Sequence, residues 1–209
     1  MKTTMILVRH GQTEWNRVER FRGHADVPLN ETGLKQASLT GERIVSSWSP
    51  AAVYSSPLSR AQKTAQAIAT PVGLPVQVFA GLADIDYGKW QGLTPDQVRE
   101  KWPEALATWF EAPHMAQIPG GESLDQLRER AMVMVDKLAA EYLGKTIVLV
   151  GHTVINRIIL LGVLGLGNEA FWRLRQEPCA INIIEAGSSG YVLATMNDTC
   201  HLQGLASSL

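Results

Sequence analysis

The stretch Met5–Asn16, with the sequence MILVRHGQTEWN, decides the fold. It opens with four apolar residues in a row, which predicts a short strand that is buried on both faces. Arg9, His10 and Gly11 follow directly. Because ligands of an open α/β sheet bind at the carboxyl ends of its strands, this tripeptide indicates an anion site. Arginine can bind two oxygens of a phosphate, while histidine is nucleophilic and carries a proton near pH 7.

A second apolar run ends in the same way. Residues 146–150, TIVLV, lead into Gly151 and His152, and apolar side chains then recur at helical spacing as far as Leu164. Two parallel strands that end at the same edge of one sheet can place His10 and His152 on either side of a single small ligand. The sequence therefore predicts that the two histidines share one site.

Arg60 supplies a further cation. A short strand is predicted at 52–54, and Pro57 suits the first position of the helix that follows it. Arg60 then falls in the first turn of this helix, close to its positive end, which also favours anions. We therefore expect Arg60 and Arg9 at the same site.

These motifs lie along the chain in the order Arg9-His10-Gly11, Ser55-Ser56-Pro57 with Arg60, and Gly151-His152. In this order they resemble the histidine phosphatase superfamily, the branch also called phosphoglycerate mutase-like. The resemblance spans nearly the whole chain and includes Thr13-Glu14, Asn16, Pro28-Leu29-Asn30, Thr32-Gly33, Gly88, Trp90, Gly92 and Gly121-Glu122-Ser123. It implies an α/β fold with a mostly parallel central sheet flanked by helices on both faces, a histidine that accepts phosphate covalently, and no metal or other cofactor.

The resemblance also implies roles for residues near these motifs. Asn16 becomes a candidate phosphate contact, and Arg22 and Gly23 are expected at the rim of the pocket with His24. Many relatives carry glutamine where Arg22 stands. Thr153, which follows the second histidine, is a further candidate for substrate binding.

The general acid is the position where the sequence departs from its relatives. Many of them show the pattern L-x-E-x-x-x-G-x-W-x-G, in which the glutamate donates a proton to the leaving group, whereas this chain has Asp84. The shorter side chain withdraws the carboxyl group by about 1.5 Å, so either the backbone compensates or the acid is weaker. Asp86 is the alternative, because side chains two residues apart face the same way in an extended segment. Asp84 is favoured, although either residue could be a loop or capping carboxylate.

Apolar residues at helical spacing predict further helices at 31–48 and 57–69, and a third from 124 to about 142. In the first of these we expect Leu34, Ala37 and Ile44 to face inward. Ser123 and Gln126 form a capping box at the start of the third helix. Two strands, at 181–185 and 191–195, are predicted to form a hairpin.

Residues 90–121 differ in character from the rest of the chain. Four prolines divide them into short helices, and Trp102, Trp109, Phe110 and Met115 give them an aromatic, adaptable surface. We interpret this segment as an inserted lid that selects the organic group of the substrate, within a single domain of residues 1–209. Taken singly, each aromatic residue is better explained by packing onto the sheet.

The composition restricts the partners. The 209 residues are 45% hydrophobic and carry a net charge of -1, which favours one large core and gives no general attraction for nucleic acid or an anionic membrane. The apolar run at 154–166 is too short to span a bilayer about 30 Å thick. No secretory signal is evident, and Cys179 and Cys200 fit no metal site. We therefore expect a cytoplasmic monomer or homodimer with reduced cysteines.

Together these features favour a metal-independent phosphatase that hydrolyses a small phosphorylated metabolite. We expect His10 to attack phosphorus while Asp84 protonates the departing oxygen. The phosphoryl oxygens are neutralised by Arg9, Arg60 and His152. Two other interpretations remain: a phosphoglycerate mutase, although cofactor-dependent mutases carry the string E-R-H-Y-G where this chain has ADIDYG, and a non-catalytic relative with a decayed acid position. Candidate substrates include phosphosugars, phosphoserine, phosphoglycerate and α-ribazole phosphate.

Overall fold

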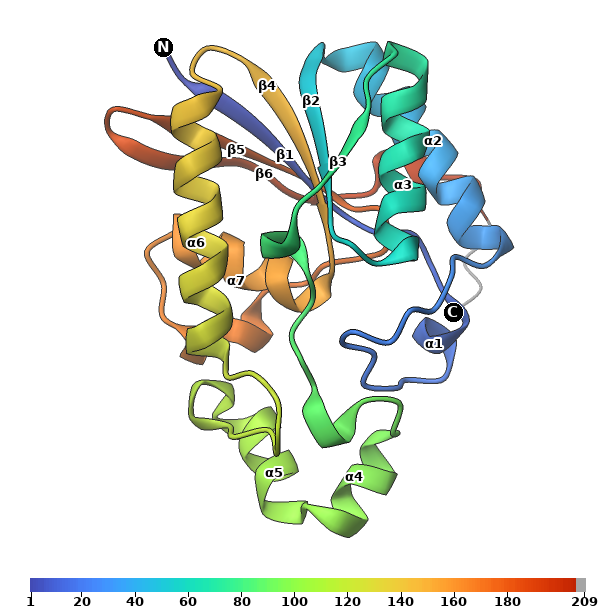
Figure 1. Cartoon of the computed structure of the whole chain (residues 1–209), viewed down its shortest axis with the longest axis vertical. Helices are drawn as coiled ribbons and strands as arrows, with labels where there is room; N and C mark the ends of the chain where they lie inside the picture. Colours follow the sequence, from blue (N-terminus) through green and yellow to red (C-terminus); the bar gives the residue numbers. More distant parts are fainter. Residues whose placement is uncertain (206–209) are drawn as a thin grey trace.

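A six-stranded sheet forms the centre of residues 1–205, the part of the chain that this computed structural model describes (Figure 1). The strands lie in the order β3-β2-β4-β1-β5-β6. Their bounds are β1 Thr3–Arg9, β2 Pro50–Ser55, β3 Val76–Val78, β4 Thr146–Gly151, β5 Ile181–Gly187 and β6 Gly190–Asp198. The first four strands of the order are parallel, whereas β5 runs antiparallel to β1, and β6 antiparallel to β5. The prediction of a mostly parallel sheet is confirmed.

The register of the sheet brings three strand ends to one edge. Arg9 at the end of β1 pairs with Gly151 at the end of β4. Val150 of β4 in turn pairs with Ser55 at the end of β2. The residues that follow these three strands therefore leave the sheet from neighbouring points, at the carboxyl edge where α/β proteins bind their ligands.

Helices cover both faces of the sheet (Figure 1). The α-helices are α1 Glu14–Arg17, α2 Glu31–Ser47, α3 Ser59–Ala69, α4 Pro95–Lys101, α5 Pro103–Glu111, α6 Leu124–Glu141 and α7 Thr153–Val163. Short 3-10 helices lie at Thr70–Val72, Ala80–Leu82, Gly88–Trp90, Pro113–Met115, Asn168–Arg173 and Cys200–Leu202. The helix predicted from 124 begins with the expected capping box, and the predicted hairpin is formed by β5 and β6.

Strand β1 explains why the protein has two hydrophobic cores. Met5 and Leu7 belong to the core that α6 and α7 complete, whereas Ile6 and Val8 belong to the core with α2 and α3. All four side chains are fully buried, as the continuous apolar run predicts. Each such burial stabilises the fold by about 1.5 to 3 kcal/mol, so the strand that carries the first histidine is firmly held.

Helix α2 buries part of the predicted stripe. Ala37 and Ile44 are buried as expected, but the side chain of Leu34 is 44% exposed, so the expectation for that residue is wrong. The helix also buries Gly33, Gly41 and a threonine. A Cβ atom on Gly41 would lie 2.4 Å from a carbonyl oxygen of α3. Small residues therefore let α2 approach α3 closely, and this contact turns the larger leucine toward solvent.

Helix α3 begins two residues later than predicted. Pro57 was expected at its first position, but the helix starts at Ser59 and Leu58 is the N-cap. The N–H of Leu58 donates to Ser56 Oγ at 3.3 Å, and the N–H of Ser59 donates to Asp26 Oδ1 at 2.8 Å. These side-chain acceptors satisfy the N–H groups ahead of the first turn. Arg60 still lies in that first turn.

Residues 90–121 form a lobe beyond the carboxyl edge of the sheet, where α4 and α5 lie at the bottom of Figure 1. The ring of Trp109 packs against Phe171 and Trp172, with ring centroids 5.5 and 5.7 Å apart. Trp109 is buried by these contacts, whereas the neighbouring Phe110 is 47% exposed. Trp90 is also fully buried and Trp102 packs against the same core, so Phe110 is the most accessible of these four aromatic residues.

Candidate active site

Two histidines meet at the carboxyl edge of the sheet. His10 follows β1, His152 follows β4, and their ring centroids are 5.0 Å apart. The N–H of His10 donates to the carbonyl of Gly151 at 3.0 Å, which extends the strand pairing by one residue. Both side chains are buried, with exposed fractions of 1% and 0%. The structure brings together the two histidines that the sequence places after separate strands.

The His10 ring is held in one tautomer. Its Nδ1 lies 2.6 Å from the carbonyl oxygen of Gly11, which can only accept, so Nδ1 carries the proton and Nε2 keeps its lone pair. Burial, the ring of His152 and the charge of Arg60 all hold the pKa of His10 well below its ordinary value. A neutral imidazole with a free Nε2 lone pair is a competent nucleophile.

His152 is held from both sides. Arg60 Nε donates to its Nδ1 at 3.2 Å, so the proton of the neutral ring lies on Nε2, which donates to Ser56 Oγ at 2.7 Å. Burial and Arg60 hold the pKa of His152 well below its ordinary value. The other ends of the Arg60 guanidinium donate to the carbonyls of Ala25 (2.6 Å) and Gly23 (2.9 Å). Arg60 therefore acts on the site through its charge and through the orientation of His152.

A cavity of about 700 Å³ is lined by Arg9 and Thr153, the sequence neighbours of His10 and His152, although the two buried histidines themselves are not part of its lining. Arg9 and Asp84 line it, with Asn16, Arg22 and Thr153. It is further lined by Glu19, Arg20, Phe21, Tyr87, Pro95, Trp109, Phe110, Val154, Arg157, Phe171, Trp172, Arg175, Gln176 and Glu177. The guanidinium of Arg9 donates to the carbonyl of Gln176 at 2.5 Å, while its buried Nε has no partner. Burial and Arg22 lower the pKa of Arg9, so this cavity concentrates positive charge that favours an anion.

Asp84 is the carboxyl group of this cavity. It is 5% exposed, and its Oδ1 is buried without a hydrogen-bond partner. Burial raises the pKa of Asp84, against the opposing effects of Arg60 and Arg22. A carboxyl group with a raised pKa keeps its proton to higher pH, which suits a general acid.

Asp86 occupies a different environment. Its Oδ1 accepts the N–H of Gly88 at 2.8 Å, and it lines a separate cavity with Glu122 and Arg130. The expectation that residues 84 and 86 face the same way is therefore wrong, because the segment turns toward Gly88, whose φ is +46°, and does not continue extended. Asp86 is a loop carboxylate, one of the roles that the sequence analysis left open, and Asp84 alone of the two lines the cavity of Arg9.

The residues from 5 to 199 match the family model described as histidine phosphatase superfamily (branch 1). The chain belongs to this superfamily.

Relatives and solved structures within the superfamily agree along nearly the whole chain. Phosphoserine phosphatase 1 of Hydrogenobacter thermophilus is 35% identical over 198 residues, which cover 95% of this chain and 93% of that protein. A metal-independent phosphoserine phosphatase of Arabidopsis thaliana is 34% identical over 205 residues, covering 97% of this chain and 84% of the relative. The solved structure of Bacillus stearothermophilus YhfR superposes with a TM-score of 0.92 at 29% identity, covering 96% of this chain and all of that one.

The residues expected at the rim of this histidine phosphatase divide into two groups. Asn16, Arg22 and Thr153 line the cavity, and the buried Oγ1 of Thr153 has no partner. Arg22 donates to the carbonyl of Trp15 at 2.8 Å. Gly23 does not line the cavity and reaches the site through its carbonyl on Arg60. His24, which was also expected at the rim, lines a different cavity, so three of the five candidates face the space where a ligand would lie.

Sequence reasoning missed the group that holds the backbone of Asp84. Arg130 Nη2 donates to the carbonyl of Asp84 at 3.0 Å, and Nη1 donates to that of Ala83, also at 3.0 Å. Glu122 pairs with the same guanidinium at 2.7 and 3.0 Å. The Nε2 of His24 donates to the Asp84 carbonyl at 2.9 Å. No local pattern signals these contacts, because Arg130 lies on α6, far along the chain.

Arg157 interrupts the apolar run of residues 154–166, and the sequence analysis gave it no role. It lies on α7, and its guanidinium lines the cavity beside two aromatic rings. A charged residue on an otherwise apolar helix was the available signal, since such a residue needs a reason to be near the core.

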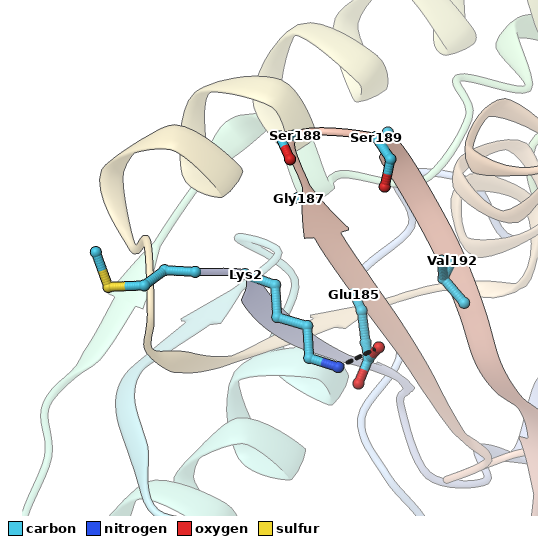
Figure 2. A pocket seen from close by; sticks show the side chains of 8 residues that line it. Lys2, Glu185, Gly187, Ser188, Ser189 and Val192 are labelled. Carbon is cyan, nitrogen blue, oxygen red and sulfur yellow. Dashed lines mark ion pairs between the residues drawn. The ribbon is translucent and has the colours of Figure 1, made fainter.

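The rest of the described chain offers fewer features that could form a functional site. A further cavity of about 290 Å³ lies at the opposite end of the sheet, between the N-terminus and the β5-β6 hairpin. Lys2 pairs there with Glu185 (Figure 2), with 2.6 Å between Nζ and Oε2. This partly exposed ion pair satisfies its own charges. Within residues 1–205 no group of three or more His, Cys, Asp or Glu side chains could hold a metal ion. None of the helices described there is long and apolar enough to cross a membrane.

Proposed function

We propose that the protein is a phosphatase that hydrolyses small phosphomonoesters without a metal, through a phosphohistidine on His10. The geometry of His10 carries this proposal: a buried neutral ring, with Nδ1–H fixed on the Gly11 carbonyl and Nε2 available. Arg9 and Asp84 line the adjoining cavity. The relatives named as phosphoserine phosphatases, one of them metal-independent, support the same activity.

In the first step the Nε2 lone pair of His10 attacks phosphorus, and the bond from phosphorus to the organic oxygen breaks. Asp84 gives its proton to this departing oxygen, so that an alcohol leaves. The guanidinium of Arg9 and the charge of Arg60 stabilise the phosphoryl oxygens. A phosphoryl oxygen also competes with Ser56 Oγ for the Nε2–H of His152, which adds a third donor.

In the second step water attacks the phosphohistidine. Asp84, now a carboxylate, takes a proton from this water, and the electron pair of the P–N bond returns to His10. Inorganic phosphate leaves, and both residues regain their starting protonation. A mutase differs only in the second step, because a substrate hydroxyl replaces water as the acceptor of the phosphoryl group.

The test is hydrolysis of p-nitrophenyl phosphate and of phosphoserine by purified protein in EDTA, followed by quenching in alkaline denaturant to preserve labelled phosphate on His10. We expect turnover in EDTA and acid-labile label on that residue alone. No turnover of any phosphomonoester would favour the non-catalytic relative. Adding 3-phosphoglycerate with its bisphosphate cofactor measures the mutase reaction, and isomerisation faster than phosphate release would overturn the phosphatase.

Two further points belong to the proposal. Cys179, which is buried, and Cys200, which is exposed, are both free, which suits a reducing compartment such as the cytoplasm. The substrate is a small phosphorylated metabolite, since a cavity of about 700 Å³ is the size of an ordinary small-molecule site. Sedimentation of the purified protein decides between a monomer and a homodimer.

A further inference from the structure

Arg157 is held between two aromatic rings on the wall of the active-site cavity. Its guanidinium lies 5.0 Å from the ring centre of Phe171 and 5.1 Å from that of Trp172. These two rings meet edge to face, 4.8 Å apart, and Trp172 is fixed further by its Nε1–H, which donates to the carbonyl of Trp109 at 2.9 Å. The charge of Arg157 is therefore positioned by rigid neighbours.

Arg157 is half-buried, and its guanidinium lacks the polar partners that such an arginine normally has. Within residues 1–205 it makes no hydrogen bond or ion pair, and its Nε is fully buried without an acceptor. Burial lowers the pKa of Arg157, while Tyr87 and Glu177 oppose this effect. Natural proteins leave few buried donors unsatisfied, because each costs about 1 to 3 kcal/mol. The planar guanidinium of an arginine that lines the cavity and has no such partner is suited to an anionic ligand.

Arg157 lines the same cavity as Arg9 and Asp84. Five arginines line the cavity: Arg9, Arg20, Arg22, Arg157 and Arg175. Arg20 donates to the carbonyl of Gly92 and Arg175 pairs with Glu177, which leaves two cationic centres for a ligand: Arg9 with Arg22, and Arg157 beside the aromatic rings. The first is assigned above to the phosphoryl group. A substrate that satisfies both centres carries a second anionic group on its organic part.

We propose that Arg157 binds a carboxylate of the substrate, so that the enzyme selects phosphomonoesters of small hydroxy acids or amino acids. This inference rests on the proposed phosphatase function and names its substrate class. Guanidinium and carboxylate match in a two-bond geometry. Glu19 and Glu177 line the same cavity, and their charges disfavour a second phosphate, which is more negative than a carboxylate.

Matched substrates test the proposal. Phosphoserine differs from phosphoethanolamine, and 3-phosphoglycerate from glycerol 3-phosphate, only at the carboxylate. In the wild type we expect kcat/KM to be higher for the carboxylate member of each pair. In Arg157→Met the carboxylate members should lose about 10- to 100-fold, while their partners lose less than about threefold. A loss by one common factor in both members would overturn the proposal, because it would assign Arg157 to the phosphoryl group or to the fold.

Two variants serve as controls. Arg175→Gln removes one positive charge from the same cavity, but the side chain is 81% exposed and bears no aromatic neighbours of this kind. If Arg175→Gln changes the carboxylate preference as much as Arg157→Met does, the preference comes from the overall positive charge of the cavity and not from a contact with Arg157, and the proposal fails. Arg157→Lys keeps the positive charge and most of the aliphatic side chain, but it replaces the planar guanidinium with an ammonium group. It should recover part of the preference, and full loss in a folded protein would contradict a charge-based contact.

Binding without turnover separates this proposal from the proposed function. In a His10→Ala background, titration calorimetry with 3-phosphoglycerate and glycerol 3-phosphate measures the preference directly. We expect tighter binding of the carboxylate member, and no difference after Arg157→Met. If the wild type hydrolyses nothing but this preference is present, the phosphatase has failed and the carboxylate site stands. Turnover with equal affinity for both members would remove the carboxylate site alone.

Discussion

The strand-end site (Arg9, His10, Ser56 and His152) and the outer wall of the cavity (Phe110, Arg157, Phe171 and Trp172) are built by different means. Main-chain pairing of β1, β4 and β2 positions the first, so its geometry follows from the register of the sheet. Ring contacts between segments far apart in sequence position the second. Under the proposed function, the reaction chemistry therefore lies on the rigid part of the molecule, and recognition of the organic group on a part that side-chain changes can alter.

The largest effect should come from the strand-end site. His10→Ala is expected to abolish turnover of every substrate, by about 10⁴ or more in kcat, because no other group can accept the phosphoryl group. Hydrolysis and acid-labile labelling measure this loss. His114→Ala, at an exposed position in the lobe, is the matched control and should leave both unchanged. Retained labelling in His10→Ala would move the nucleophile away from the strand end.

Asp84 tests whether chemistry extends beyond the strand ends. Asp84→Asn should lower kcat/KM for an alkyl ester such as phosphoserine by about 10² or more, and for p-nitrophenyl phosphate much less, since nitrophenolate hardly needs a proton. Asp86→Asn is the control and should show no such contrast, because that carboxylate accepts the N–H of Gly88 in a loop and does not line the cavity of Arg9. If the contrast follows residue 86, or neither residue, the acid has been assigned to the wrong group.

These two regions also differ in how far they could be predicted from sequence. An unbroken apolar run before His10 and another before His152 specify buried parallel strands, and the site edge follows from them. Arg157 could not be assigned, because its function depends on rings of residues 171 and 172 that fold back onto α7. The orientation of Asp86 was wrong for a similar reason: the turn at Gly88 is stabilised by main-chain contacts with residues 119–122, which periodicity does not reveal.

A smaller and selective effect is expected from the outer wall. Phe110 lines the cavity and stacks on Trp172 at 5.5 Å and 25°, but it is largely accessible, so its removal should not damage the core. Phe110→Ala should change the order of preferred substrates by several-fold while p-nitrophenyl phosphate changes little. Met115→Ala, exposed in the same lobe and outside the cavity lining, is the control. If Phe110→Ala changes kcat/KM by the same factor for all substrates, the outer wall of the cavity does not select among them. The buried Trp109 is a poorer probe, because its loss costs about 3 to 5 kcal/mol of stability.

The smallest expected effect is on stability, because the buried carboxyl group of Asp84 lowers the free energy of unfolding when it ionises. Its pKa is raised in the native protein, so below the ordinary value of 3.8 the group is protonated in both folded and unfolded chains and costs nothing. As pH rises, the unfolded chain ionises first, and the native state loses relative stability until pH passes the native pKa. A tenfold difference in acidity between the folded and unfolded chains corresponds to about 1.4 kcal/mol.

Asp84→Asn removes this penalty, because an amide does not ionise. We therefore expect the variant to be more stable than the wild type at neutral pH, by a few degrees in Tm, since about 1 kcal/mol corresponds to roughly 2 to 4 °C in a chain of this size. The difference should shrink as pH falls toward 4, and thermal unfolding between pH 4.5 and 8 measures it. A difference that does not depend on pH would mean that the buried carboxyl is not under electrostatic strain. A variant that loses catalysis while gaining stability in this pH-dependent way would mark Asp84 as a functional group held in the fold at a cost.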